Sequence, residues 1–318
     1  MKVMIRKLTQ TQMIVIGYAL IILTGALLLM LPAASRDGLA TSFPDALFTA
    51  TSASCVTGLV IADTFSKWTM FGQCIILAMI QIGGLGFMTI GVFFAIILRR
   101  KIGLWMRGTL QESVNILQIG GIVRLAKKIM LGTLLFEGVG AALLTLRFQE
   151  QMGWGKAVYY GIFHSISAFC NAGFDLMGKD APYTSFTGYY DDPLVNIVIM
   201  ALIIIGGIGF FVWNDVSTHR HHISRYRLHT KIVLVTTAIL VIGGAALLYL
   251  FESQNTLDGM STQGKVLSSL FGSVTARTAG FNTVDTAALT DNSKMLTIFL
   301  MFIGGSPGST AGGIKTTT

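Results

Sequence analysis

The sequence contains few charged residues. Asp, Glu, Lys and Arg make up 12% of its 318 residues and hydrophobic residues make up 53%, whereas a soluble domain carries about 25% charged residues. Several apolar runs, the first from Met13 to Leu31, reach the roughly 20 residues that cross a bilayer as a helix. The scarcity of charge therefore excludes an ordinary soluble domain and predicts an all-α integral membrane protein.

Cysteine is also scarce. The three cysteines, Cys55, Cys74 and Cys170, have neither metal-ligand spacing nor a paired framework. No H-E-x-x-H motif is present. These absences exclude a disulfide scaffold and a zinc enzyme of that motif.

The basic residues are unevenly distributed, and their distribution predicts the orientation. They gather in the amino-terminal segment and in two connections: Lys2, Arg6 and Lys7; Arg99, Arg100, Lys101, Arg107, Arg124, Lys127 and Lys128; Arg220, Arg225, Arg227 and Lys231. Because basic connections stay on the cytoplasmic side, we expect the amino terminus and both connections inside the cell. The other connections are mainly acidic and would raise the local concentration of cations. The net charge of +8 does not require nucleic-acid binding.

Glycine, in contrast, is abundant, with 36 glycines against five prolines, and its positions indicate three repeated units. Each unit has an apolar outer helix, a short amphipathic segment and an inner helix with a double glycine. The ranges in chain order are about 12–32, 43–59 and 69–98; about 129–147, 158–174 and 193–213; and about 230–251, 265–281 and a helix that begins near residue 294. The units divide the chain at 1–104, 105–222 and 223–318.

The short segments are predicted to be re-entrant loops. Gly58, Gly173 and Gly280 fall in register within them, 115 and 107 residues apart. Each segment holds about a dozen helix-compatible residues, too few to span. If they did span, the basic connections would lie on opposite sides of the membrane. Non-helical backbone at membrane depth survives only beside protein or a water-filled cavity, so these loops are expected to line a pore.

A pore for alkali cations needs oxygen ligands, which potassium filters supply as rings of backbone carbonyls. Successive carbonyls can all point toward the pore axis only if the backbone alternates between right-handed and left-handed conformations. Glycine adopts the positive φ of the left-handed conformation at no steric cost. We therefore predict a selectivity filter from the end of each short segment: Cys55, Val56, Thr57 and Gly58; Cys170, Asn171, Ala172 and Gly173; Arg277, Thr278, Ala279 and Gly280. The alternative is that the glycines are simple turn residues.

The loops SASCVTGL, SAFCNAGF and TARTAGF, with QIGGLGFMT and RLHTKI, resemble the membrane subunit of the Ktr potassium uptake system, in the Trk/Ktr/HKT superfamily. The resemblance covers the whole chain. It implies four outer helix–pore loop–inner helix units, like those of potassium channels, with pseudo-fourfold symmetry. It assigns the filter glycines to Gly58, Gly173 and Gly280. Relatives with serine at the first of these tend to favour sodium, so Gly58 suggests potassium.

The resemblance also implies partners and ions. These are a homodimer in a bacterial cell membrane, contact with membrane lipid, and a cytosolic nucleotide-binding regulatory subunit. K⁺ is the expected transported ion, and Na⁺ is a candidate activating or coupling ion. Since four units close the ring and three are found here, we expect the chain to be a fragment that lacks about 110 residues by its own spacing.

The third inner helix runs into GGSPGSTAGGIKTT (304–317), a stretch that cannot continue an α-helix in a bilayer without other partners. By resemblance it is the family's intramembrane gating loop, which lies beneath the filter. Its predicted gate residues are Gly304, Gly305, Ser306, Gly308, Ser309, Thr310, Gly312, Gly313 and Lys315. A kinked helix end is the alternative.

Four polar side chains at membrane depth need an explanation. A buried arginine costs about 2.5–3.5 kcal/mol on insertion scales and should have a partner, so Arg277 either clamps loop carbonyls behind the filter or tunes the field at the ion. Glu137 is expected to pair with a neighbouring unit or lie at a subunit interface, and His164 to be packed and hydrogen-bonded. Asn171 either offers an oxygen near the pore or packs behind its loop.

Two other functions are alternatives to potassium transport. The first is a sodium-permeable or weakly selective cation transporter. The second is an intramembrane hydrolase with Ser306 or Ser309 as nucleophile, which needs a base within hydrogen-bond reach. No histidine lies in the predicted inner helices to act as that base, so transport is favoured.

Overall fold

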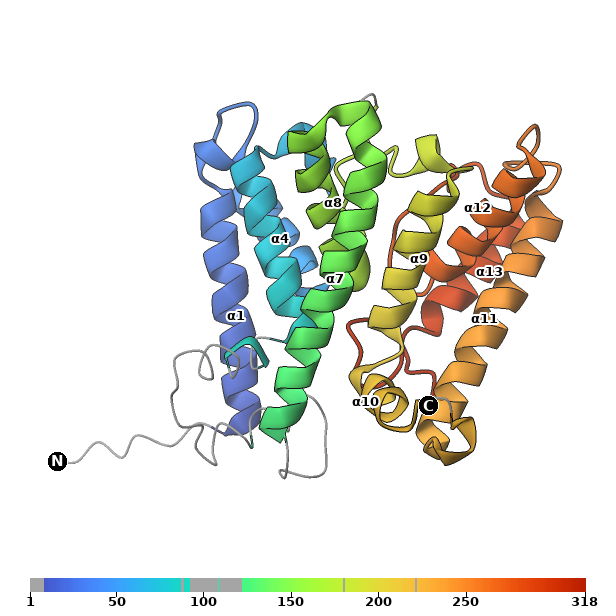
Figure 1. Ribbon diagram of the computed structural model, residues 1–318. Coiled ribbons are helices and arrows are strands. Elements are labelled where there is room, and N and C mark those ends of the chain that lie inside the picture. The colour runs from blue at the N-terminus through green and yellow to red at the C-terminus, as the bar shows by residue number, and fades with distance from the viewer. Residues whose placement is uncertain (1–8, 87–88, 92–107, 109–121, 180, 221) are drawn as a thin grey trace.

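The structure is a computed structural model that describes residues 9–86, 89–91, 108, 122–179, 181–220 and 222–318. Within these residues it is all-α, and the only β-pairing there is two isolated bridges, Ser35 with Trp68 and Ile303 with Ile314. The helices stand side by side in one bundle (Figure 1). The amino-terminal cations Lys2, Arg6 and Lys7 and the connection residues Arg99, Arg100, Lys101 and Arg107 lie outside the described residues.

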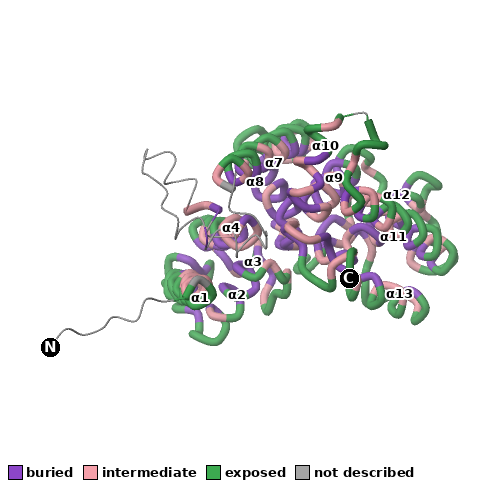
Figure 2. Tube along the Cα trace, turned by 90° about the horizontal axis from the view of Figure 1, so that it is seen from below, coloured by how far each residue is buried: buried purple, intermediate pink, exposed green. Residues whose placement is uncertain are grey.

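Among the described residues, three helices are long and apolar enough to cross a membrane, and each is the outer helix of one predicted unit: α1 (Gln10–Leu29), α7 (Ile122–Met152) and α11 (Leu228–Glu252). Large apolar side chains on them face outward: Val15 is 63% exposed, Leu135 62% and Ile239 65%. Figure 2 shows exposed positions around the rim of the bundle and buried positions in its interior. This is the arrangement of a multi-pass membrane protein, whose outer surface is solvated by lipid.

Each unit contains a shorter helix between its outer and inner helices. These are α2 (Phe43–Cys55), α8 (Trp154–Phe169) and α12 (Thr262–Thr275). Serine caps start two of them, since Ser42 Oγ accepts from the Asp45 backbone N–H at 3.3 Å and Ser261 Oγ from that of Gly264 at 3.0 Å. With at most 16 residues they are shorter than a span, and each ends where a predicted filter segment begins.

The inner helices are α4 (Met70–Leu85), the pair α9 (Pro193–Gly207) and α10 (Phe210–His219), and α13 (Asp291–Phe302). The remaining short elements are α3 (Thr64–Lys67), η1 (Pro32–Ala34), η2 (Thr187–Tyr189) and η3 (Ile223–Arg225).

The prediction that the second inner helix is continuous is wrong. It is bent by 96° between α9 and α10, just after its double glycine. The first inner helix was expected to run to residue 98; α4 ends at Leu85, where Gly86 has a φ of 77°, and residues 92–98 of the expected range lie outside the described residues. The third ends at Phe302, before its own double glycine. All three inner helices therefore break within about two residues of their double glycine.

Candidate functional site

The three predicted filter segments share one backbone conformation. In each, the glycine and the residue two positions before it have positive φ: Val56 (54°) and Gly58 (74°), Asn171 (57°) and Gly173 (70°), Thr278 (72°) and Gly280 (97°). A non-glycine residue with positive φ is uncommon. Its recurrence at the same place in three loops argues against simple turns, because successive peptide groups then alternate in hand as a carbonyl-lined filter requires.

The three loops meet at one point. A Cβ added to Gly58 would lie 2.7 Å from the carbonyl oxygen of Ala172 and 3.6 Å from that of Ala279. One added to Gly173 would lie 2.3 Å from the same oxygen of Ala279. Loops that are far apart in sequence therefore place backbone oxygens against one another's glycines, and a side chain at either glycine would occupy that space.

The short helices direct their carboxyl-terminal ends toward this meeting point, because α2, α8 and α12 each end within two residues of the start of a predicted filter segment. The carboxyl-terminal end of a helix carries a partial negative charge from its unpaired carbonyls. Three such ends around one centre favour a cation there and disfavour an anion.

A hydroxyl near the end of each short helix holds its loop, a feature that the sequence interpretation missed. Ser167 Oγ donates to the Phe174 carbonyl at 2.7 Å, and Thr275 Oγ1 donates to that of Phe281 at 2.7 Å. In the first unit, Ser52 Oγ accepts from the hydroxyl of the loop's threonine at 2.8 Å. A Ser or Thr five or six residues before each filter glycine was the available sequence signal.

The double glycines of the inner helices allow the loops to approach. A Cβ on Gly83 would lie 2.0 Å from the carbonyl oxygen of Ser54, and one on Gly206 would lie 1.9 Å from that of Phe169. Each of these carbonyls belongs to the residue four positions before its unit's filter glycine. The same contact in two units shows that the repeat extends to the packing of the loop on its inner helix.

The glycine-rich loop folds back on itself. The backbone N–H of Gly305 donates to the carbonyl of Gly312 at 3.0 Å. Lys315 Nζ donates to the Ala311 carbonyl at 2.7 Å. Backbone–backbone and side chain–backbone hydrogen bonds thus satisfy peptide groups that no longer belong to a helix, as membrane depth requires.

This loop also docks on the bend between α9 and α10. The Ser306 backbone N–H donates to the Gly207 carbonyl at 2.9 Å, and the Phe210 N–H donates to the Gly308 carbonyl at 2.7 Å. Groups that a continuous helix would pair internally are therefore paired with the loop. The bend and the loop stabilise each other.

Two side chains connect the loop to the filter segments. Thr310 Oγ1 accepts from Asn171 Nδ2 at 3.0 Å and donates to the Phe169 carbonyl at 2.9 Å. Arg277 Nη2 donates to the Gly304 carbonyl at 3.1 Å, and the arginine is 8% exposed. This geometry favours the clamp interpretation of Arg277 and places the Asn171 amide behind its loop.

Other buried polar residues have structural partners. His164 is fully buried, its Nδ1 lies 2.8 Å from the Tyr160 carbonyl and its Nε2 accepts from the Leu176 backbone N–H at 3.0 Å, which confirms the packed interpretation. Glu137 in α7 accepts from Gln81 Nε2 in α4 at 3.1 Å. The expected pairing of Glu137 with a neighbouring unit is therefore confirmed.

The fold and the loops define a class: a multi-pass helical membrane protein whose repeated hairpins bring re-entrant loops together. The sequence matches the TrkH family, described as cation transport protein, over residues 4–318. The chain therefore belongs to this family of transporters, and it is not an enzyme.

Several of its relatives are named for potassium uptake. The chain is 43% identical to the potassium/sodium uptake protein NtpJ of Enterococcus hirae, covering 100% of this chain and 70% of the relative. It is 43% identical to the Ktr system potassium uptake protein B of Bacillus subtilis, covering 98% and 69%. The potassium transporter TrkH from Vibrio parahaemolyticus matches in structure with a TM-score of 0.73 at 19% identity, covering 99% of this chain and 60% of that one. This likeness confirms the fold.

Proposed function

We propose that the complete protein takes up potassium ions across a bacterial cell membrane through a backbone-carbonyl selectivity filter. The observation that carries this proposal is the meeting of three loops with the same alternating backbone, where the carbonyls of Ala172 and Ala279 lie against Gly58 and Gly173. Such a centre offers neutral oxygen ligands in place of an ion's hydration shell. The names of the relatives support potassium as the ion.

The proposed filter comprises the last four residues of each segment, from Cys55, Cys170 and Arg277 to the three filter glycines. Each of the three units contributes one side of this filter: 1–104, 105–222 and 223–318. A fourth unit in the complete protein would supply the remaining side. The greater length of the relatives, of which this chain covers 70% and 69%, supports that addition.

The glycine-rich loop from Gly304 to Lys315 is the proposed gate. It is bonded to filter segments two and three and to the bend of the second inner helix, so displacement of the loop and opening of the path would be coupled. Hydrogen bonds hold it in one docked position in this structure. The gate would open when the loop breaks its hydrogen bonds to the filter segments and to the bend and its polar groups find other partners.

The amino terminus and both basic connections are proposed to lie in the cytoplasm. The described cations of these connections include Arg124, Lys127, Lys128, Arg225 and Arg227. A homodimer and a cytosolic nucleotide-binding subunit would meet this face, and Na⁺ would act as an activating or coupling ion. The relatives named as parts of a Ktr system support a multi-subunit assembly.

Growth of a potassium-uptake-deficient bacterium tests the transport proposal. Expression of the complete protein should restore growth at limiting potassium, while the same cells with an empty vector should not grow. Failure to restore growth, with the protein and its regulatory subunit both present in the membrane fraction, would contradict the proposal.

Replacement of Gly58 by Ser should weaken the preference for potassium. A Cβ at Gly58 would lie 2.7 Å from the Ala172 carbonyl oxygen and would sit on a residue with φ of 74°, so the serine must displace that oxygen. We expect sodium uptake relative to potassium uptake to rise by about tenfold, which corresponds to about 1.4 kcal/mol. Rubidium and sodium tracer fluxes in vesicles would measure the ratio.

Gly243→Ser is the matched control, because a Cβ at Gly243 in α11 meets no atom within 4 Å. Its flux ratio should equal that of the unmodified protein.

The alternative function, a sodium-permeable transporter, is suggested by the potassium/sodium name of one relative. An unmodified protein that already carries sodium as fast as potassium, with Gly58→Ser unchanged, would favour that alternative.

A further inference from the structure

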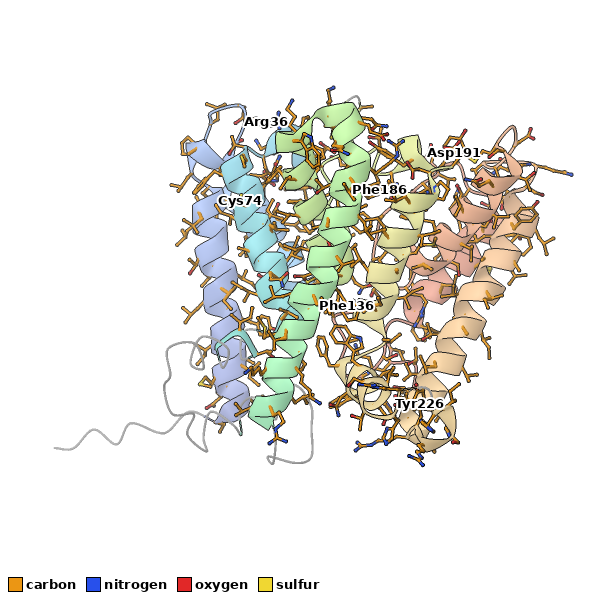
Figure 3. All side chains as sticks on the ribbon, viewed as in Figure 1. Arg36, Cys74, Phe136, Phe186, Asp191 and Tyr226 are labelled. Atoms are coloured by element: carbon orange, nitrogen blue, oxygen red, sulfur yellow. The ribbon has the colours of Figure 1, made fainter. Side chains whose placement is uncertain are left out.

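A groove of about 540 Å³ lies between the lower part of α7 and the α9–α10 bend, on the outside of the bundle. Its walls are mostly apolar and include Leu131, Phe136, Ile208 and Trp213. One end is polar, where Lys128 and Asn214 line it. Figure 3 shows Phe136 in the lower half of α7, beside the gap above α10. The groove lies apart from the meeting point of the three loops, although Phe210, which bonds the glycine-rich loop, is one of its lining residues.

Lys128 lines the polar end of the groove, and two further cations stand beside it on α7. Arg124, Lys127 and Lys128 are exposed and stand at positions i, i+3 and i+4 of α7, so they share one face of its first turns. Lys128 Nζ donates to Asn214 Oδ1 of α10 at 2.9 Å, which bridges the end of the groove. On the same face, farther into the membrane, Leu131 is 53% exposed and Leu135 is 62% exposed.

We propose that this groove binds an anionic phospholipid of the inner leaflet. The headgroup phosphate would lie at Arg124, Lys127 and Lys128, and an acyl chain would follow Leu131 and the apolar walls. The order from cations to exposed leucines matches the order from headgroup to chain in a lipid. Basic pockets between membrane helices on the cytoplasmic side bind acidic headgroups, and the basic ends of these helices are the ones proposed to face the cytoplasm.

A chain in the groove would contact Trp213, which connects the groove to the site. Gly132 has no side chain, and a Cβ there would lie 3.1 Å from the Trp213 ring. Trp213 Nε1 donates to the Ile205 carbonyl at 2.9 Å, and its ring centroid lies 5.6 Å from that of Phe169 at the end of α8. The bound lipid would therefore brace α10 in the position that holds the glycine-rich loop through Phe210.

Native mass spectrometry of the complete protein, titrated with phosphatidylglycerol, tests the proposal without any measurement of transport. The unmodified protein should retain phosphatidylglycerol in preference to phosphatidylcholine. Lys128→Gln should weaken phosphatidylglycerol binding by about fivefold, the effect of one basic residue near an anionic lipid. Combined replacement of Arg124, Lys127 and Lys128 by Gln should abolish the preference.

Lys156→Gln is the matched control, because Lys156 is also exposed and its loss removes one charge near the start of α8. It should bind phosphatidylglycerol like the unmodified protein. Equal weakening by Lys128→Gln and Lys156→Gln would overturn the proposal, as would equal retention of phosphatidylcholine or displacement by inorganic phosphate. A disulfide-linked dimer formed through Leu131→Cys, in a protein without its native cysteines, would place a second copy over the groove and would also overturn it.

Discussion

Gly173→Ala should reduce potassium uptake by the complete protein to the background of cells without it. The added methyl would lie 2.3 Å from the carbonyl oxygen of Ala279 and 3.1 Å from the Cα of Gly280, distances at which backbone must move. The residue also has a φ of 70°, which costs an alanine about 1–2 kcal/mol. Because the displaced oxygen belongs to the third loop, one methyl disturbs two sides of the proposed filter.

Rubidium uptake into vesicles, normalised to the amount of protein in them, measures this effect. Gly138→Ala is the control, since a Cβ at Gly138 in α7 meets no atom within 4 Å. It adds the same methyl at membrane depth and should leave uptake unchanged. Normal uptake by Gly173→Ala would show that ions do not pass the meeting point of the loops.

The repeated hairpins could be predicted from the sequence because their signal is local. An apolar run, a short amphipathic segment and a glycine in register are readable at each unit, and the structure places helices α2, α8 and α12 where the short segments were expected. The orientation of the carbonyls in the proposed filter depends on alternating φ, and only the glycines suggest that alternation in the sequence. The positive φ of Val56 and Thr278 had no such signal.

The bend of the second inner helix could not be predicted from its own residues. IIGGIGF continues an apolar helical run, and glycine within a membrane helix is ordinary. The bend is stabilised by partners about 100 residues later in the chain, the backbone groups of Ser306 and Gly308. Local propensity favours a straight helix, but the tertiary hydrogen bonds to the glycine-rich loop stabilise the bent one.

The partners of two buried polar side chains could not be predicted from neighbouring residues either. Glu137 required a partner, but nothing in the sequence near it indicated Gln81 of the first unit. Arg277 likewise required a hydrogen-bond acceptor, and the Gly304 carbonyl became one only because the third inner helix ends at Phe302. In both cases the sequence indicated that the buried side chain requires a hydrogen-bond partner, and only the fold identifies that partner.

Thr310→Val should increase potassium uptake by about tenfold or more. Valine keeps the shape of threonine but removes the hydroxyl that joins Asn171 Nδ2 and the Phe169 carbonyl to the glycine-rich loop. Each hydrogen bond contributes about 1 kcal/mol net, and two of them correspond to more than a tenfold change in an equilibrium. If the docked loop is the closed gate, its loss of these bonds shifts the population toward the open state. The initial rate of rubidium uptake measures the shift.

Thr133→Val separates the loss of these bonds from the loss of a hydroxyl as such. Thr133 is fully buried in α7, and its hydroxyl finds no hydrogen-bond partner among the described residues. The same exchange there removes no bond from the loop, so uptake should stay at the level of the unmodified protein. A fall in uptake with Thr310→Val, while Thr133→Val is unchanged, would mean that the docked loop supports conduction rather than blocking it. The hydrogen bonds of Thr310 would then stabilise the open path, and the closed state would be a different arrangement of residues 304–317.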